Sequence, residues 1–143
     1  MADVIFNNFK KKIMDGSIDL DTDTIKVSLH TSSYTPDQDA HDFWDDTTNE
    51  VSTSGSYTAG IAGGVSLANK AVTADSTDNE GMFDADDVSI TGFTGTFKWI
   101  VLRKDTGTAS TSPLICAIDA TSVSATAGTV AIAWAAEGII NIT

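Results

Sequence analysis

The stretch TFKWIVLRK, residues 96–104, decides the fold class. Its apolar side chains fall on both sides of a two-residue period. On one side lie Phe97, Trp99 and Val101, and on the other lie Ile100 and Leu102. A run of this kind is typical of a β-strand that is covered on both faces. The sequence therefore predicts a central strand over 96–104.

The rest of the chain after Gly16 reads as short strands separated by turns. Thr, Ser, Gly and β-branched residues dominate it, and its apolar runs last only about four to eight residues, as strands do. We expect strands near residues 24–30, 64–72, 80–84, 88–91, 96–104, 114–119, 129–135 and 138–142. The sequence thus predicts an all-β fold, an antiparallel β-sandwich formed by residues 17–143 as a single domain. Trp99 and Trp134 are expected in its core.

A row of carboxylates, Asp19, Asp21 and Asp23, precedes the strand at 24–30. A calcium loop of the EF-hand type also needs a glycine at its sixth position and a glutamate at its twelfth. Thr24 and His30 hold those positions here, so the motif fails. We interpret the row as a solvated approach to the strand and expect no metal ion or other cofactor.

The first sixteen residues differ in character from the rest. Asp3 is placed to cap a short helix in which Ile5, Phe9 and Ile13 recur at a four-residue spacing. Lys10, Lys11 and Lys12 form the basic part of the same segment. Residues 1–16 are therefore expected to form an N-terminal helix or arm. The helix either packs on its own sandwich or docks into a neighbouring subunit, and both alternatives stay open.

Composition limits the classes of partner. The chain has 143 residues, with 8 basic and 20 acidic side chains and a formal net charge of −12. Such a surface repels nucleic-acid phosphates and anionic lipids, so neither a nucleic acid nor a membrane is an expected partner. No secretory signal or membrane-spanning stretch is recognisable, which favours synthesis in a cytoplasm. Cys116 is the sole cysteine and reads as a small buried residue.

The polar section from Thr31 to Tyr57 predicts a large surface loop fixed by aromatic side chains. Among its acids it carries Tyr34, Phe43 and Trp44. Loops of this size frequently serve contact with other molecules, so Phe43 and Trp44 are candidates for a binding surface. Trp44→Ala is accordingly expected to weaken partner binding and leave stability nearly unchanged.

The sequence contains no recognisable catalytic motif. A nucleophilic enzyme needs a histidine base, and the two histidines are His30, on the polar side of its strand, and His41, in the acidic loop. Neither accompanies a nucleophile motif, so an enzyme is not expected. Asp84, Asp86 and Asp87 form an acidic turn that could supply oxygens to a calcium ion, although such a turn needs no ion to be stable.

The ending EGIINIT, residues 137–143, has no charge after Glu137. A bare apolar strand at a sheet edge invites pairing with another chain. We therefore expect this segment to be either an inner strand or a strand paired with a neighbouring subunit.

Four longer segments resemble one group of proteins. They are DVIFNNFKKKIMDGSIDLDTDTIKVSLHTSSYTPDQDAHDFWDD, GGVSLANKAVTADSTDNEGMFDADDV, WIVLRKDTGTASTSPLICAIDA and WAAEGIINI. Over nearly the whole chain they are similar to small virion proteins of tailed bacteriophages. The resemblance implies a β-sandwich structural subunit that is made in the infected bacterium and mounted on the particle. It supplies no catalytic residues.

The function expected on these grounds is that of a capsid decoration, or cement, protein of a bacteriophage virion. Its expected partners are the major capsid protein or other virion subunits, with self-association also open. The candidate partner-binding residues are Ile5, Phe9, Lys10, Lys11, Lys12, Ile13, Phe43 and Trp44. Two alternatives remain: a head-tail or tail subunit, and a carbohydrate-binding module that stacks sugars on Phe43, Trp44 or Tyr57.

Overall fold

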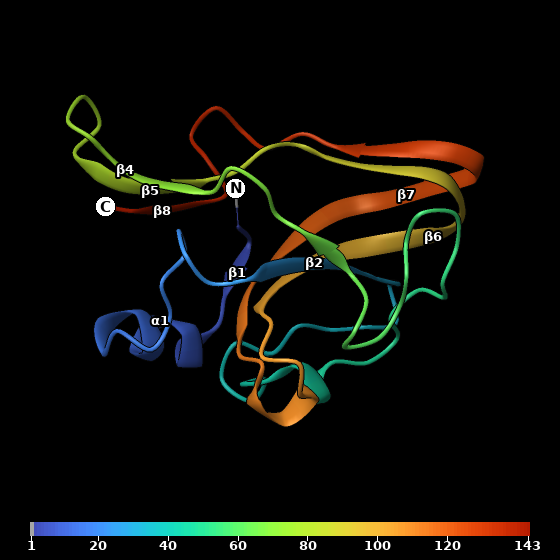
Figure 1. Ribbon diagram of the computed structural model, residues 1–143, viewed down its shortest axis with the longest axis horizontal. Helices are drawn as coiled ribbons and strands as arrows, with labels where there is room; N and C mark the ends of the chain where they lie inside the picture. The colour runs from blue at the N-terminus through green and yellow to red at the C-terminus, as the bar shows by residue number, and fades with distance from the viewer. Residues whose placement is uncertain (1) are drawn as a thin grey trace.

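The computed structural model describes residues 2–143. The fold is all-β and sandwich-like, with two antiparallel sheets and one short N-terminal helix, as the sequence predicted (Figure 1). The larger sheet has the order β1-β7-β6-β2-β3, and the smaller has the order β4-β5-β8. The elements are β1 (Val4–Ile5), α1 (Asn7–Met14), β2 (Ile25–His30), η1 (Trp44–Asp46), β3 (Val65–Ser66), β4 (Ala71–Asp75), β5 (Glu80–Asp84), β6 (Val88–Lys104), η2 (Ala109–Thr111), β7 (Leu114–Ile132) and β8 (Ile140–Ile142).

A long hairpin of β6 and β7 forms the centre of the molecule. The sequence predicted four shorter strands here, but 88–91 and 96–104 are joined in β6, and most of 114–119 and 129–135 in β7. The two strands bend, so that the half of the hairpin formed by residues 88–95 and 125–132 folds back over the half formed by residues 96–104 and 114–124 (Figure 1). Register shifts between Ile90 and Phe97 accompany the bend, as β-bulges do. Gly92 has a left-handed φ of 66°, a conformation that residues with a side chain rarely adopt.

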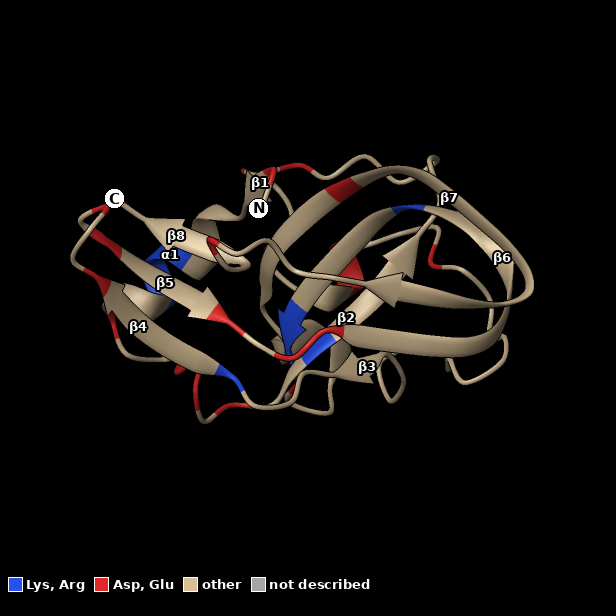
Figure 2. Ribbon diagram, turned by 90° about the horizontal axis from the view of Figure 1, so that it is seen from above, with Lys and Arg blue, Asp and Glu red and all other residues tan. Residues whose placement is uncertain are grey.

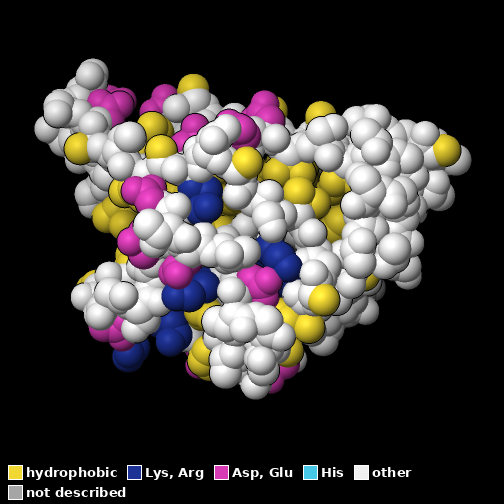
Figure 3. Space-filling model, in the orientation of Figure 1, with side chains coloured by type: hydrophobic (Ala, Val, Ile, Leu, Met, Phe, Trp, Pro, Cys, Tyr) yellow, Lys and Arg dark blue, Asp and Glu magenta, His cyan; other side chains and the backbone are white. Residues whose placement is uncertain are grey.

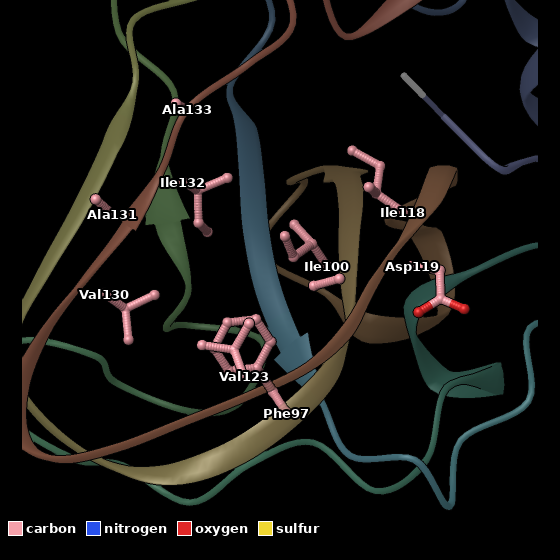
Figure 4. A pocket seen from close by; sticks show the side chains of 10 residues that line it. Phe97, Ile100, Ile118, Asp119, Val123, Val130, Ala131, Ile132 and Ala133 are labelled. Carbon is pink, nitrogen blue, oxygen red and sulfur yellow. The ribbon is translucent and has the colours of Figure 1, made fainter.

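Apolar side chains fill the space between the two halves of this hairpin. Phe93 and Phe97 meet edge to face with ring centroids 6.1 Å apart, and both are fully buried. A gap of about 250 Å³ remains between Phe97, Ile100, Ile118 and Ile132 (Figure 4). Asp119 at its rim pairs with Lys98 at 3.3 Å, and the other residues that line the gap have apolar side chains. The strand at 96–104 is central, as predicted, because β6 lies between β7 and β2.

The carboxylates before β2 form a closed turn. The Asp19 carboxylate accepts hydrogen bonds from the backbone N–H groups of Asp21 and Thr22, and the Asp23 carboxylate accepts one from the N–H of Asp19. Asp23 also pairs with Lys104 of β6 at 2.7 Å. Hydrogen bonds to the backbone of the turn and the ion pair with Lys104 therefore hold the segment before β2 in place.

The N-terminal segment packs on the chain's own sandwich, which is the first of the two alternatives left open for residues 1–16. Val4 and Ile5 form the edge strand β1 and pair with Ala117 and Cys116 of β7. The helix starts only at Asn7, and Asp3 accepts a hydrogen bond from the backbone N–H of Asp119 instead of capping it. The flanking aromatic residues, Phe6 and Phe9, are almost completely buried.

The section from 31 to 57 carries many exposed residues and is fixed by buried aromatic side chains, as predicted, but the expectation that Trp44 is exposed for contact was wrong. Trp44 is only 7% exposed, and the Arg103 guanidinium lies over its ring at 4.0 Å. Tyr57 is fully buried, and its hydroxyl joins the backbone N–H of Leu29 to the carboxylate of Glu50. Tyr34, Trp44 and Tyr57 of the loop therefore belong to the core, whereas Phe43 is half-buried.

The two tryptophans expected in the core lie at its margin. Trp99 and Trp134 are each half-buried and pack against the buried clusters from outside. The indole N–H of Trp134 donates to the backbone carbonyl of Asp86, and its backbone N–H donates to the carboxylate of Asp87. Cys116, in contrast, is fully buried, as predicted.

Candidate docking surface

The helix α1 lies beside β8, although the two segments are at opposite ends of the chain. Phe9 anchors the helix, because its side chain enters the main core, while Ile5 and Ile13 are half-buried next to it. The backbone N–H of Ala2 donates to the carbonyl of Ile139 and so ties the two ends of the chain together. This arrangement fixes the spacing between the helix and the strand.

Between α1 and β8 runs an apolar groove of about 440 Å³, which we call the docking groove. It is lined by Ile5, Phe9, Lys10, Ile13, Met14, Ile140, Asn141, Ile142 and Thr143. The structure thus brings Ile5, Phe9, Lys10 and Ile13 together, as the sequence pattern suggested. The contributions of Met14 and of β8 were not foreseen.

The largest exposed apolar side chains of the described residues gather at this groove. Met14 is 80% exposed, Ile142 is 56% exposed and Val72 is 51% exposed. Met14 and Ile142 line the docking groove, and Val72 borders an adjoining hollow that Ile142 shares. Isolated exposed apolar residues are common, but a contiguous group of them marks an interaction site.

The α1 side of the groove has a basic rim, to which Lys10 contributes directly, while Lys11 and Lys12 follow it on the same helix outside the groove. Lys10 donates to the side-chain oxygen of Asn7, Lys11 pairs with Asp15 at 2.7 Å, and Lys12 lies over the Phe43 ring at 5.7 Å. The Lys11 ammonium holds the pKa of the Asp15 carboxyl well below its usual range. Within residues 2–143, Lys10 and Lys12 have no carboxylate within ion-pair distance. Figure 3 shows blue side chains at the lower left, in the region where Figure 1 places α1.

The remaining candidate residues are placed elsewhere. Phe43 is half-buried beneath Lys12, next to α1 but outside the groove. Trp44 is buried and cannot reach a partner surface, which corrects its assignment as a partner-binding residue. Lys11 and Lys12 lie on α1 but do not line the groove.

The free edge of β8 borders the same groove. β8 is the outermost strand of the smaller sheet, so the alternative that 137–143 forms an inner strand was wrong. Ile139 and Ile140 are buried, while Ile142 stays exposed. Pairing of this edge with a neighbouring subunit stays a prediction.

Ser28 and His30 of β2 form a buried polar cluster. His30 is fully buried, although the two-residue period places it on the polar side of its strand. Its Nδ1–H donates to the carbonyl of Thr48 at 2.8 Å, and its Nε2 lies 3.1 Å from the hydroxyl oxygen of Ser28, which also lies 3.2 Å from the carbonyl of Val101. The order serine, histidine, carbonyl resembles a nucleophile with its base, but both side chains are fully buried and no substrate can reach the Ser28 oxygen.

This histidine should make stability depend on pH. Burial lowers the pKa of His30 to about 4, from an ordinary 6.5. In the unfolded chain His30 takes up a proton below pH 6.5, but in the folded chain it does so only near pH 4. The contribution of neutral His30 to the free energy of unfolding is therefore fully present above pH 6.5 and is lost as the pH falls from 6.5 to 4. We expect a loss of up to about 3 kcal/mol across this window in urea unfolding. His30→Gln should flatten the profile and His41→Gln should not; a flat wild-type profile would contradict the expectation.

The acidic turn proposed for calcium has other roles. The Asp86 carboxylate accepts from the side chain of Asn69 at 2.6 Å, and Asp87 accepts from Trp134. Among residues 2–143, no group of three or more His, Cys, Asp or Glu side chains is arranged to hold a metal ion. Of the three aromatic residues considered for a sugar platform, Trp44 and Tyr57 are buried and Phe43 is half-buried.

Comparison with protein-family models, with curated proteins and with solved structures found no match. In the part of the chain that is described, no helix has the length and apolar character needed to cross a membrane.

Proposed function

We propose that this chain is a structural subunit of a tailed-bacteriophage virion, a capsid decoration protein that binds the head shell through the docking groove. The observation that carries the proposal is the gathering of exposed apolar side chains beside a basic rim on a protein of net charge −12. The resemblance of four sequence segments to small virion proteins supplies the biological setting. The major capsid protein is the proposed partner.

The groove supplies two kinds of binding energy. Burial of Met14 and Ile142 removes apolar surface from water, at about 25 cal/mol for each Å². Lys10 and Lys12 offer charge complementarity to carboxylates on the partner. Because these lysines are near the surface, binding should weaken as salt screens them.

A cosedimentation assay with shells that lack this chain tests the proposal. Met14→Glu combined with Ile142→Asp should reduce the amount bound at least tenfold, because both changes place a charge in the apolar contact. A matched variant, Ser122→Glu with Thr126→Asp, makes the same change in net charge at exposed positions of β7 and should bind normally. Equal binding of both variants would refute the docking groove.

A second pair of variants isolates the basic rim. Lys10→Glu reverses a charge that lines the groove, and Lys11→Glu makes the same change on the same helix outside it. Only Lys10→Glu should weaken binding several-fold. The exposed pair between Lys11 and Asp15 contributes little to stability, so Lys11→Glu should remain folded. Loss of binding in Lys11→Glu alone would move the contact away from the groove.

A further inference from the structure

The strand β4 presents an unusually open edge. It is the outermost strand of the smaller sheet, opposite β8, and pairs only with β5 (Figure 2). Ala71, Val72, Thr73 and Ala74 are all exposed and uncharged. Proteins usually protect such edges with charges, prolines or bulges, because unpaired backbone groups are templates for another strand. None of these devices occurs between Ala71 and Ala74.

We propose that two copies of this chain pair through their β4 edges, antiparallel about a two-fold axis at Thr73. The result is a continuous sheet with three strands from each copy. This contact is distinct from the docking of the chain on a shell.

The extended part of β4 sets the register. Asn69 and Asn79 have left-handed φ values of 49° and 59°, so the extended edge cannot continue past either of them. A two-fold axis perpendicular to a sheet places one residue opposite its own copy. With Thr73 at that position, all five residues of β4 are paired and Val72 lies opposite the partner's Ala74. A shift by one residue either way brings Asn69 or the turn after Asp75 into the pairing.

The charges of the hairpin favour a second copy as the occupant. The base of β4 carries Lys70, which has no ion-pair partner within residues 2–143. The other end carries Asp75 and Asp78. Antiparallel pairing brings the acidic end of each copy beside Lys70 of the other. The net charge of −12 opposes association, but at 0.15 M salt exposed charges are screened beyond about 8 Å.

The carboxylate at this end remains ionised. Asp75 accepts hydrogen bonds from the backbone N–H groups of Thr77 and Asp78, which hold its pKa below the usual range. It can therefore attract Lys70 of a second copy at neutral pH.

The pairing has a consequence that rests on the proposed function. Val72 lies opposite Phe83, and Phe83 lies opposite Ile140, so these side chains share the face of the sheet that packs toward α1. A two-fold axis perpendicular to the sheet keeps that face on the same side in both copies. The two docking grooves of a dimer would then face the same way, and both could bind one shell. Two linked contacts bind more tightly than one.

Disulfide trapping of the isolated chain tests the pairing without any particle. Cys116 does not interfere, because it is fully buried and burial raises the pKa of its thiol to about 12. Under mild oxidation at 0.15 M salt, Thr73→Cys should form a covalent dimer at least tenfold faster than Ser122→Cys, an exposed control on β7. Val72→Cys and Ala74→Cys should react more slowly, because each is diagonal to its own copy.

Charge reversal provides the second readout. In the Thr73→Cys background, Lys70→Glu should slow trapping several-fold, and adding Asp78→Lys should restore it. A Thr73→Cys rate equal to the Ser122→Cys control overturns the pairing, and a fastest reaction at Val72→Cys or Ala74→Cys overturns the register. Shell binding by the groove is measured separately, so failure of the pairing leaves the proposed function standing.

Discussion

Trp44→Ala should destabilise the folded chain by about 3–5 kcal/mol, the range observed when large aromatic residues are truncated in a core. Trp44 is 7% exposed, lies 4.0 Å from the Arg103 guanidinium and meets the His30 ring edge to face at 5.4 Å. Its loss would leave a cavity and would uncover a fully buried arginine. The free energy of unfolding in urea measures the effect.

Arg103 adds to the cost of this substitution. One terminal nitrogen of its guanidinium donates to the carbonyls of Ile61 and Gly63, both at 3.0 Å, but no carboxylate among the described residues pairs with it. The Trp44 ring is therefore the group that faces the positive charge, and cation–π contacts are stronger where water is excluded.

Two controls separate this role from a general effect of the loop. Trp44→Phe retains an aromatic face and should cost less than Trp44→Ala. Phe43→Ala removes a neighbouring ring that is only half-buried and should also cost less. If Trp44→Ala unfolds at the same urea concentration as the wild type, Trp44 is not a core residue.

Removal of residues 2–15 should abolish the folded state. The deletion takes away Phe6 and Phe9, whose truncation would each cost about 3–5 kcal/mol, together with the β1 ladder on β7. Their sum reaches the total stability of an ordinary domain, which is about 5–15 kcal/mol. The deleted chain should show neither a cooperative melting transition nor protected amides in β7.

Surface changes in the same segment give the matching control. Met14 and Lys11 are exposed, so Met14→Ala and Lys11→Ala should melt within about 0.5 kcal/mol of the wild type. A deleted chain that keeps its melting transition would instead favour the other alternative left open by the sequence, an arm that can be removed without harm to the domain.

Local patterns in the sequence were sufficient for the fold class. The alternation of Ile25, Val27 and Leu29 predicted β2, and the two-sided apolar run over 96–104 predicted the central strand; both occur. The continuous course of β6 through Gly92 and Gly95 was not predictable in this way, because those glycines are also typical of turns between separate strands. Only the pairing with β7 decides between the two.

Burial of polar and aromatic groups depended on contacts distant in the sequence. His30 occupies the polar side of its strand by period, yet Tyr34 and Trp44 cover it. Trp44 in turn is buried by Arg103, which is far along the chain. No local period contains this information, and the predictions for His30 and Trp44 failed for that reason.

One wall of the docking groove was predictable from the sequence. The four-residue spacing of Ile5, Phe9 and Ile13 indicated an apolar stripe, and all three line the groove. The other wall comes from β8, whose position beside α1 results from the sheet order β4-β5-β8 and from the contact of Ala2 with Ile139. A stripe on a helix does not reveal which strand faces it.

The position and orientation of the chain in images of intact particles test the central claim most directly. On the proposed function, particles that carry this chain should show its density on the outer surface of the head, with α1 and β8 toward the shell and the bend of the β6–β7 hairpin toward solvent. Density in which α1 and β8 face solvent, or heads that carry no copy of the chain, would contradict it.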